Sequence, residues 1–190
     1  MSGWIWFCQR LAHWRWRREL RQLRLLVLDV DGVLTDGGLW TTETGEVIKR
    51  FDVRDGLGIR LLQNAGLEVA FLSGGKSGAT EQRARYLGIR HVLTGVKDKP
   101  AALAALQASL AITPGQTAFV GDDLNDLAVR SRVGLLIATA DAVAPLRRRA
   151  DWVLDRSGGH GAVRRLSEAI LQAQGHWREL AQRGWRDRND

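Results

Sequence analysis

The sequence predicts a three-layer α/β fold, in which a mainly parallel sheet lies between layers of helices. From residue 25 onward, short apolar runs alternate with stretches of helical spacing, which is the order typical of such folds. Most of the apolar runs show no alternation of apolar and polar residues, as expected of strands covered on both faces. With 190 residues, 45% of them hydrophobic, the chain is long enough for one domain with a substantial core.

Six strands and six helices are expected to alternate along the chain. The strands are predicted at the apolar runs 25–30, 67–73, 91–93, 117–122, 133–137 and 151–154. Helical spacing predicts helices over residues 55–65, 77–87, 99–110, 123–131, 141–149 and 160–175. Residues 37–51 break this pattern, because two β-rich pieces flank a Glu-Thr-Gly turn, and they predict a hairpin that projects from the sheet.

Positive charge is concentrated at the N-terminus. The formal net charge is +7, yet residues 25–177 carry 18 basic and 17 acidic side chains. Residues 1–24 hold six Arg, one Glu and four of the eight tryptophans. We therefore divide the chain into a basic, Trp- and Arg-rich extension (1–24), a folded domain (25–177) and a C-terminal tail (178–190).

The extension has one plain interpretation and two functional ones. The tryptophans of the extension are mixed with arginines, so they could bind an anionic membrane surface or stack on the bases of a nucleic acid. They are Trp4, Trp6, Trp14 and Trp16. A loosely ordered terminus is the plainer interpretation, and we expect no nucleic-acid partner. Its apolar opening of about eight residues is much shorter than a transmembrane span of about 20, and no export signal is expected. The single cysteine, Cys8, cannot form an internal disulfide, which agrees with a cytoplasmic location.

Chemically active side chains follow several of the predicted strands. Asp29 and Asp31 follow the first strand, Ser73 and Gly74 the second, and Asp122 and Asp126 the fourth, while Lys99 begins the helix after the third. Parallel sheets of this kind bind ligands beyond the carboxyl ends of their strands. Carboxylates gathered there would repel one another unless a divalent cation were bound, and ligands that are all oxygen favour Mg²⁺.

These residues form four short motifs that resemble those of the haloacid dehalogenase superfamily of phosphohydrolases. The motifs are Asp29-Val30-Asp31-Gly32-Val33-Leu34-Thr35-Asp36-Gly37, Ser73, Lys99 and Gly121-Asp122-Asp123-Leu124-Asn125-Asp126. The resemblance implies a Rossmann-like α/β/α fold. Only 41 residues separate Asp31 from Ser73 and 25 separate Ser73 from Lys99, so the sequence has no room for the cap domain of other members.

The resemblance also implies a role for each residue. Asp29 would attack phosphorus and form an aspartyl-phosphate, and Asp31 would act as general acid and then as general base. Magnesium would be held by the carboxylates of Asp29 and Asp122 and by the main-chain carbonyl of Asp31. Ser73 would bind a phosphoryl oxygen, and Lys99 would offset charge in the transition state.

The remaining acid of the fourth motif is expected to act indirectly. Asp126 would orient a metal-bound water or Lys99 rather than bind the metal itself. It is therefore predicted as a neighbour of the metal ligands and not as one of them.

Among capless members, the sequence is similar to phosphatases of 3-deoxy-D-manno-octulosonate 8-phosphate, an eight-carbon 2-keto sugar acid phosphate used in lipopolysaccharide biosynthesis. The similar segments are Phe51-Asp52-Val53-Arg54-Asp55-Gly56-Leu57-Gly58-Ile59-Arg60, Arg83 with 87–89, and Gly158-Gly159-His160-Gly161-Ala162-Val163-Arg164. This likeness implies a homo-oligomer, expected to be a tetramer, in which the hairpins associate and a neighbouring subunit completes the site.

Candidate substrate-binding residues are chosen for their fit to an anionic sugar. They are Ser73, Gly74, Arg54, Arg60, Lys76, Arg83 and His160. The family often has Thr-Gly-Arg where this chain has Ser73-Gly74-Gly75, and arginine where it has His160. Lys76 and His160 are candidates to replace those arginines, and a sialic-acid-type 9-phosphate stays an alternative substrate.

Overall fold

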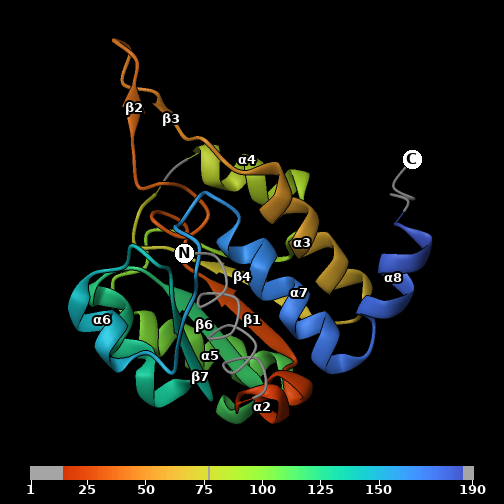
Figure 1. The fold of residues 1–190 in the computed structure, drawn as a ribbon. Coiled ribbons are helices and arrows are strands. Elements are labelled where there is room, and N and C mark those ends of the chain that lie inside the picture. The colour runs from red at the N-terminus through yellow and green to blue at the C-terminus, as the bar shows by residue number, and fades with distance from the viewer. Residues whose placement is uncertain (1–14, 77, 186–190) are drawn as a thin grey trace.

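A computed structural model describes residues 15–76 and 78–185 and shows a six-stranded sheet covered by helices. The strand order is β5-β4-β1-β6-β7-β8, and all neighbouring strands of this sheet run parallel (Figure 1). The strands are β1 (Leu25–Leu28), β4 (Glu68–Leu72), β5 (His91–Leu93), β6 (Thr117–Gly121), β7 (Leu135–Ala138) and β8 (Trp152–Val153). The predicted fold class and all six predicted strands are confirmed.

The helices form the two outer layers. The helices packed on one face of the sheet are α2 (Arg17–Gln22), α3 (Val53–Asn64), α4 (Gly78–Tyr86), α7 (Ala162–Gln174) and α8 (Trp177–Arg183). The opposite face is covered by α5 (Lys99–Leu110), the 3₁₀ segment η2 (Leu124–Arg132) and α6 (Ala144–Arg149). A short 3₁₀ turn, η1 (Pro114–Gln116), leads into β6. In Figure 1, α3 and α7 lie side by side across the sheet.

Strand β1 shows why the sheet strands are apolar throughout. Leu26 and Leu28 pack into the core beneath α3 and α7, whereas Leu25 and Val27 pack into the core beneath α5 and α6. All four side chains are fully buried. Successive side chains of a strand point to opposite faces, so a strand covered on both faces needs apolar residues at every position.

The predicted hairpin is present and stands clear of the sheet. Strands β2 (Trp40–Thr41) and β3 (Val47–Ile48) pair antiparallel, and Figure 1 shows them projecting from the body of the molecule. Three large apolar side chains of this arm are exposed: Leu39, Trp40 and Ile48, at 60%, 70% and 55%.

Segment η2 differs from the predicted α-helix over 123–131. The Asp126 carboxylate turns back and accepts hydrogen bonds from the backbone amides of Asp122 and Asp123, and the amide of Asp126 donates to the Asp123 carbonyl. These contacts favour a tight turn with 3₁₀ spacing at the start of the segment.

Residues before position 25 pack against the folded domain, although the sequence predicted that the domain begins at residue 25. Helix α2 packs against α7, Leu20 is fully buried, and the Trp16 indole donates a hydrogen bond to the Asp151 carbonyl. The other tryptophans assigned to the extension, Trp4, Trp6 and Trp14, lie outside the described residues. In residues 15–76 and 78–185, every helix is too short or too polar to cross a bilayer.

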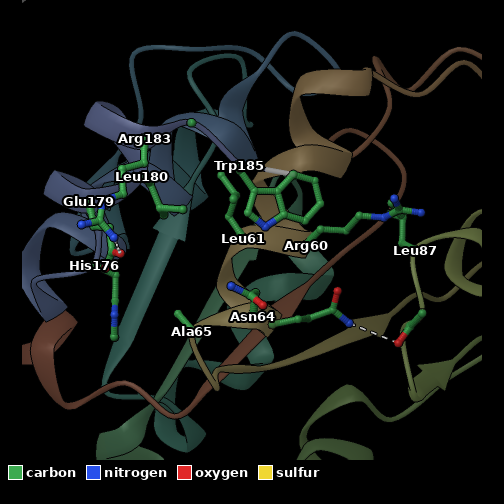
Figure 2. Close-up of a pocket in the computed structure, with 13 residues that line it drawn as sticks. Arg60, Leu61, Asn64, Ala65, Leu87, His176, Glu179, Leu180, Arg183 and Trp185 are labelled. Carbon is green, nitrogen blue, oxygen red and sulfur yellow. Dashed lines mark hydrogen bonds and ion pairs between the residues drawn. The ribbon is translucent and has the colours of Figure 1, made fainter. Parts of the chain in front are cut away.

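A cavity of about 960 Å³ lies between the C-terminal part of α3 and α8 (Figure 2). Arg60, Asn64, His176, Leu180 and Trp185 contribute to its lining. The aspartates predicted to carry the chemistry do not line this cavity, so it is separate from the site described next.

Candidate active site

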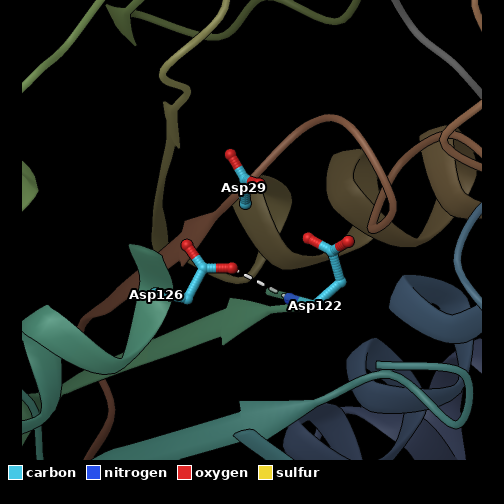
Figure 3. A group of neighbouring side chains, drawn as sticks. All are labelled: Asp29, Asp122 and Asp126. Atoms are coloured by element: carbon cyan, nitrogen blue, oxygen red, sulfur yellow. Dashed lines mark hydrogen bonds between the residues drawn. The ribbon is translucent and has the colours of Figure 1, made fainter. Parts of the chain in front are cut away.

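Three carboxylates meet at the carboxyl edge of the two central strands. Asp29 follows β1, and its amide donates to the Val120 carbonyl of β6, which continues the pairing of these strands. Asp122 follows β6 directly, and Asp126 lies four residues further on in η2. Each of the three acids offers an oxygen within 4.8 Å of the others. Figure 3 shows the three side chains grouped at this edge.

Two glycines permit the close approach of the surrounding loops. Gly32 has φ +80°, and a side chain there would collide with the Asp122 carboxylate. Gly158 packs so closely on the Gly32 carbonyl that any Cβ would overlap it. The loop after β1 is therefore held between the Asp122 carboxylate and the loop before α7, which fixes the position of Asp29 and Asp31.

Lys99 links two of the three carboxylates. Its side chain is buried at the start of α5, where Nζ lies 3.1 Å from Asp29 Oδ1 and 2.7 Å from Asp126 Oδ1. Burial alone would lower the pKa of the Lys99 ammonium, but Asp29 and Asp126 outweigh it and raise the pKa above its usual value. Lys99 is therefore a fixed cation beside the Asp29 carboxylate.

One lysine does not balance the negative charge of this cluster. Burial, followed by repulsion from Asp126, raises the pKa of Asp29 to about 6, although Lys99 acts in the opposite direction. Burial, followed by repulsion from Asp29 and Asp126, raises the pKa of Asp122 to about 8. A divalent cation would offset this repulsion, and a donor set made only of carboxylate oxygens suits Mg²⁺.

Asp31 occupies a different position from the other acids. Its carboxylate does not belong to the cluster of Asp29, Asp122 and Asp126 and pairs with Lys49, whose Nζ lies 2.7 Å from Oδ1 and 2.9 Å from Oδ2. Lys49 directly follows β3 of the hairpin. Sequence reasoning did not select Lys49, because no local motif marks a lysine whose partner lies 18 residues away.

The second motif lies beside Asp31. Ser73 is buried after β4, and its Oγ accepts a hydrogen bond of 3.2 Å from the Gly75 amide. A side chain at Gly75 would start 3.2 Å from Asp31 Oδ2 and 3.6 Å from Ser73 Oγ, so both groups border the same space. Gly74 follows Ser73 in this turn, close to the Val96 carbonyl.

Comparisons with known proteins agree with this geometry. A sequence model of the haloacid dehalogenase-like hydrolase family matches residues 87–166. The 3-deoxy-D-manno-octulosonate 8-phosphate phosphatase KdsC of Escherichia coli strain K12 is 47% identical over 157 residues, which cover 83% of this chain and 84% of the relative. The chain belongs to the KdsC family of haloacid dehalogenase-like hydrolases. It is thus a phosphatase by family.

Solved structures of KdsC-family proteins have the same fold. The 3-deoxy-D-manno-octulosonate 8-phosphate phosphatase of Yersinia pestis is 42% identical, with a TM-score of 0.83 over 85% of this chain and 88% of that one. The Moraxella catarrhalis phosphatase, solved with magnesium, phosphate and the sugar acid, is 34% identical, with a TM-score of 0.86 over 88% and 97%. The magnesium ion in that relative is consistent with the cluster of carboxylate oxygens in this chain.

Three of the cations predicted to bind substrate lie at or near the loops of the KdsC-family site. Arg54 forms a two-pronged ion pair with Asp52, which lowers the pKa of that carboxyl, and its guanidinium lies near Gly161. His160 is exposed in the same loop, and its Nδ1 lies 2.7 Å from the Gly158 carbonyl. Lys76 follows the Ser73 turn and runs beside Gly95.

The other two predicted cations lie further along α3 and α4. Arg83 donates to the Asp52 carbonyl and packs on the Phe51 ring. Arg60 lies two turns beyond the start of α3, donates to the Tyr86 carbonyl and lines the cavity beside α8 (Figure 2). Arg60 therefore lines a cavity whose lining does not include Asp29, Asp122 or Asp126.

Proposed function

We propose that this chain hydrolyses 3-deoxy-D-manno-octulosonate 8-phosphate to the free sugar acid and phosphate, with Mg²⁺ as cofactor. The observation that carries the proposal is the cluster of the buried Asp29 and Asp126 and the half-buried Asp122 with Lys99, in a chain 47% identical to a phosphatase of that substrate. Buried acids in a ring around one point, next to a fixed lysine, suit the transfer of a dianionic phosphoryl group.

In this proposal the two acids of the first motif divide the reaction into two displacements. An Asp29 oxygen attacks phosphorus, the P–O bond to the sugar breaks, and the departing sugar oxygen takes a proton from Asp31. Asp31 then takes a proton from a water that attacks the phosphorus of phospho-Asp29, which releases phosphate and restores the Asp29 carboxylate. Ser73 Oγ and the Lys99 ammonium face the phosphoryl oxygens.

The donor set fits a magnesium ion. Asp29 and Asp122 would hold it through their carboxylates, together with the main-chain carbonyl of Asp31. Bound Mg²⁺ supplies positive charge that offsets repulsion between the phosphate and Asp29. Asp126 uses Oδ1 for Lys99 and Oδ2 for two backbone amides, so we assign it the role of holding Lys99 and the η2 turn.

We also propose that the enzyme is a cytoplasmic homo-oligomer, with a tetramer as the expected form. The exposed apolar arm formed by Leu39, Trp40 and Ile48 supports this assembly, because large apolar groups on a projecting hairpin are stabilised by burial against another chain. Residues 15–76 and 78–185 contain no cap domain over the site, so a neighbouring subunit would close it. In this proposal Arg54, Lys76 and His160 are the cations that contact the sugar acid.

A phosphate-release screen tests the proposal. The purified chain is assayed on a panel of sugar acid phosphates, including the eight-carbon and nine-carbon acids, with Mg²⁺ and with a chelator. We expect the highest kcat/KM on the eight-carbon acid and loss of turnover without the metal. Preference for the nine-carbon acid, or turnover that survives chelation, would refute the substrate or the cofactor respectively.

A further inference from the structure

Lys49 is a buried lysine that the roles above leave unexplained. Its side chain is 3% exposed, although it belongs to the base of a projecting hairpin. Its ammonium group contacts both Asp31 oxygens, at 2.7 and 2.9 Å, and donates to Thr80 Oγ1 at 3.2 Å. Two of these contacts are hydrogen bonds, to Asp31 Oδ2 and to Thr80 Oγ1, and the contact with Asp31 Oδ1 is an ion pair.

Burial makes these contacts necessary for the lysine. A buried ammonium group is unfavourable unless a counter-charge and hydrogen-bond acceptors replace its water. Asp31 is the acid that supplies the charge, and Thr80, 1% exposed on α4, supplies a neutral acceptor. The ammonium therefore ties together three segments: the loop after β1, the end of the hairpin and α4.

The contacts also restrict Asp31. Its side chain is 34% exposed, so one side remains open while Lys49 holds both oxygens from the other. A carboxylate held at both oxygens has lost rotation about its terminal bond, and proton transfer depends on such alignment. Asp29 also contacts a buried lysine, but Lys99 reaches only one of its oxygens, Oδ1 at 3.1 Å.

We propose that Lys49 is a positioning residue that fixes the orientation of the Asp31 carboxyl group, which in its protonated form gives a proton to the sugar oxygen and in its ionised form takes one from the attacking water. The inference rests on the proposed roles of Asp29 and Asp31. The ion pair of Lys49 is with the Asp31 side chain and not with the carboxylates of Asp29 and Asp122, which would hold magnesium. Its removal should slow the proton-transfer steps and leave phosphoryl transfer to Asp29 intact when the leaving group needs no proton.

The test uses Lys49→Met, which keeps the length of the side chain and removes the charge. Steady-state turnover of the sugar acid phosphate is expected to fall about 10²-fold, the usual range for an impaired general acid or base. With p-nitrophenyl phosphate and Mg²⁺, rapid mixing should still show a burst of nitrophenolate, equal in amount to enzyme, at close to the wild-type rate. Slow turnover should follow that burst, because hydrolysis of the phosphoenzyme still needs Asp31.

Three comparisons complete the experiment. Thr80→Val keeps the ion pair between Lys49 and Asp31 and removes one hydrogen bond of Lys49. It should shift the ratio of burst to turnover in the same direction by a smaller factor. This variant tests the inference even if Lys49→Met does not fold. Lys97→Met, at an exposed lysine, should behave as wild type. Asp29→Asn should lose the burst, which tests the proposed function separately. A Lys49→Met enzyme whose burst and turnover fall by the same factor, or do not change, would overturn the inference.

Discussion

The carboxylate cluster (Asp29, Asp122, Asp126 and Lys99) differs in burial from the exposed cations Arg54 and His160, which we call the cationic rim. In the cluster, Asp29, Asp126 and Lys99 are each at most 5% exposed and are joined by contacts of 2.7 to 3.1 Å. On the rim, the Arg54 side chain is 61% exposed, His160 is exposed, and each already contacts a group of its own chain. The chemistry is therefore fixed within the subunit, whereas the groups that would contact the sugar are solvent-facing.

The difference has a physical origin. Charges as close as those in the cluster need fixed partners and low mobility, and the ends of β1 and β6 provide both. A surface arginine paired with Asp52 gains little from that pair in water and can exchange it for a substrate carboxylate. Variants in the cluster should therefore remove activity on any phosphate ester, while variants on the rim should change only the choice of ester.

The largest effect is expected from Asp29→Asn. Without a carboxylate to attack phosphorus, release of phosphate should fall at least about 10³-fold for both the sugar acid phosphate and p-nitrophenyl phosphate. The replacement is nearly isosteric, and circular dichroism should show an unchanged fold. Residual turnover near the wild-type rate would place the nucleophile elsewhere.

Lys99→Met should have the next largest effect. Removing the fixed cation beside Asp29 should lower kcat by about 10²- to 10³-fold on both substrates, with a smaller change in KM. Steady-state kinetics at saturating Mg²⁺ measures this split. A change confined to KM would mean that Lys99 binds phosphate in the ground state only.

The raised pKa values of Asp122 and Asp29 predict how pH affects the metal-free protein. The folded pKa values, about 8 and about 6, lie above the ordinary value of 3.8, so the folded state retains protons that the unfolded chain has lost. The free energy of unfolding should therefore fall as pH rises from about 4 to about 8. Mg²⁺ favours the ionised acids, so its stabilising effect should grow over the same range.

Thermal unfolding with and without Mg²⁺ across this pH range measures the effect. Asp55, whose pKa burial also raises to about 6, contributes in the lower part of the range. Asp122→Asn is the matched control, because it removes only the group that titrates highest, and its unfolding midpoint should depend less on pH between about 6 and about 8. A wild-type midpoint that does not change with pH in the absence of metal would contradict the charge imbalance described here.

The smallest effect is expected on the rim. Arg54→Gln should raise KM for the sugar acid phosphate about tenfold, because one charge-assisted hydrogen bond contributes about 1.5 kcal/mol. The KM for p-nitrophenyl phosphate should not change. Arg60→Gln is the comparison variant, because Arg60 lines the cavity beside α8, and its KM should stay within about twofold of wild type. A larger effect at Arg60 than at Arg54 would reverse this assignment.

The sequence was sufficient for the sheet and for the cluster because both depend on local pattern. Apolar runs mark strands covered on both faces, and residues at the carboxyl ends of parallel strands meet at one edge. Asp29 and Asp122 are brought together in this way by the pairing of β1 with β6. Helix α2 was missed because Leu20 is its one apolar residue and stands among charged and polar ones, so the helix lacks the repeated apolar spacing that predicts a helix.

Other features depend on contacts between distant segments and leave no local pattern. The pairing of Lys49 with Asp31 requires the path of the hairpin, which the sequence does not specify in detail. Arg60 lies on α3 and lines a cavity that α8 helps to form, and α8 was not predicted. The candidate cations were chosen for charge alone, and the structure shows that they contact different segments, with Arg54 near Gly161 and Arg60 at the cavity beside α8. Their contacts with substrate stay predictions.

The central claim, that Asp29 forms a covalent bond to phosphorus, can be tested by chemical trapping. Enzyme turning over the sugar acid phosphate with Mg²⁺ is quenched in acid, treated with borohydride and digested for peptide mass spectrometry. Reduction of a phosphorylated aspartate gives homoserine, and we expect it at position 29 and not at Asp31 or Asp122. Homoserine at another position, or no modified aspartate in an enzyme that turns over at full rate, would contradict the account.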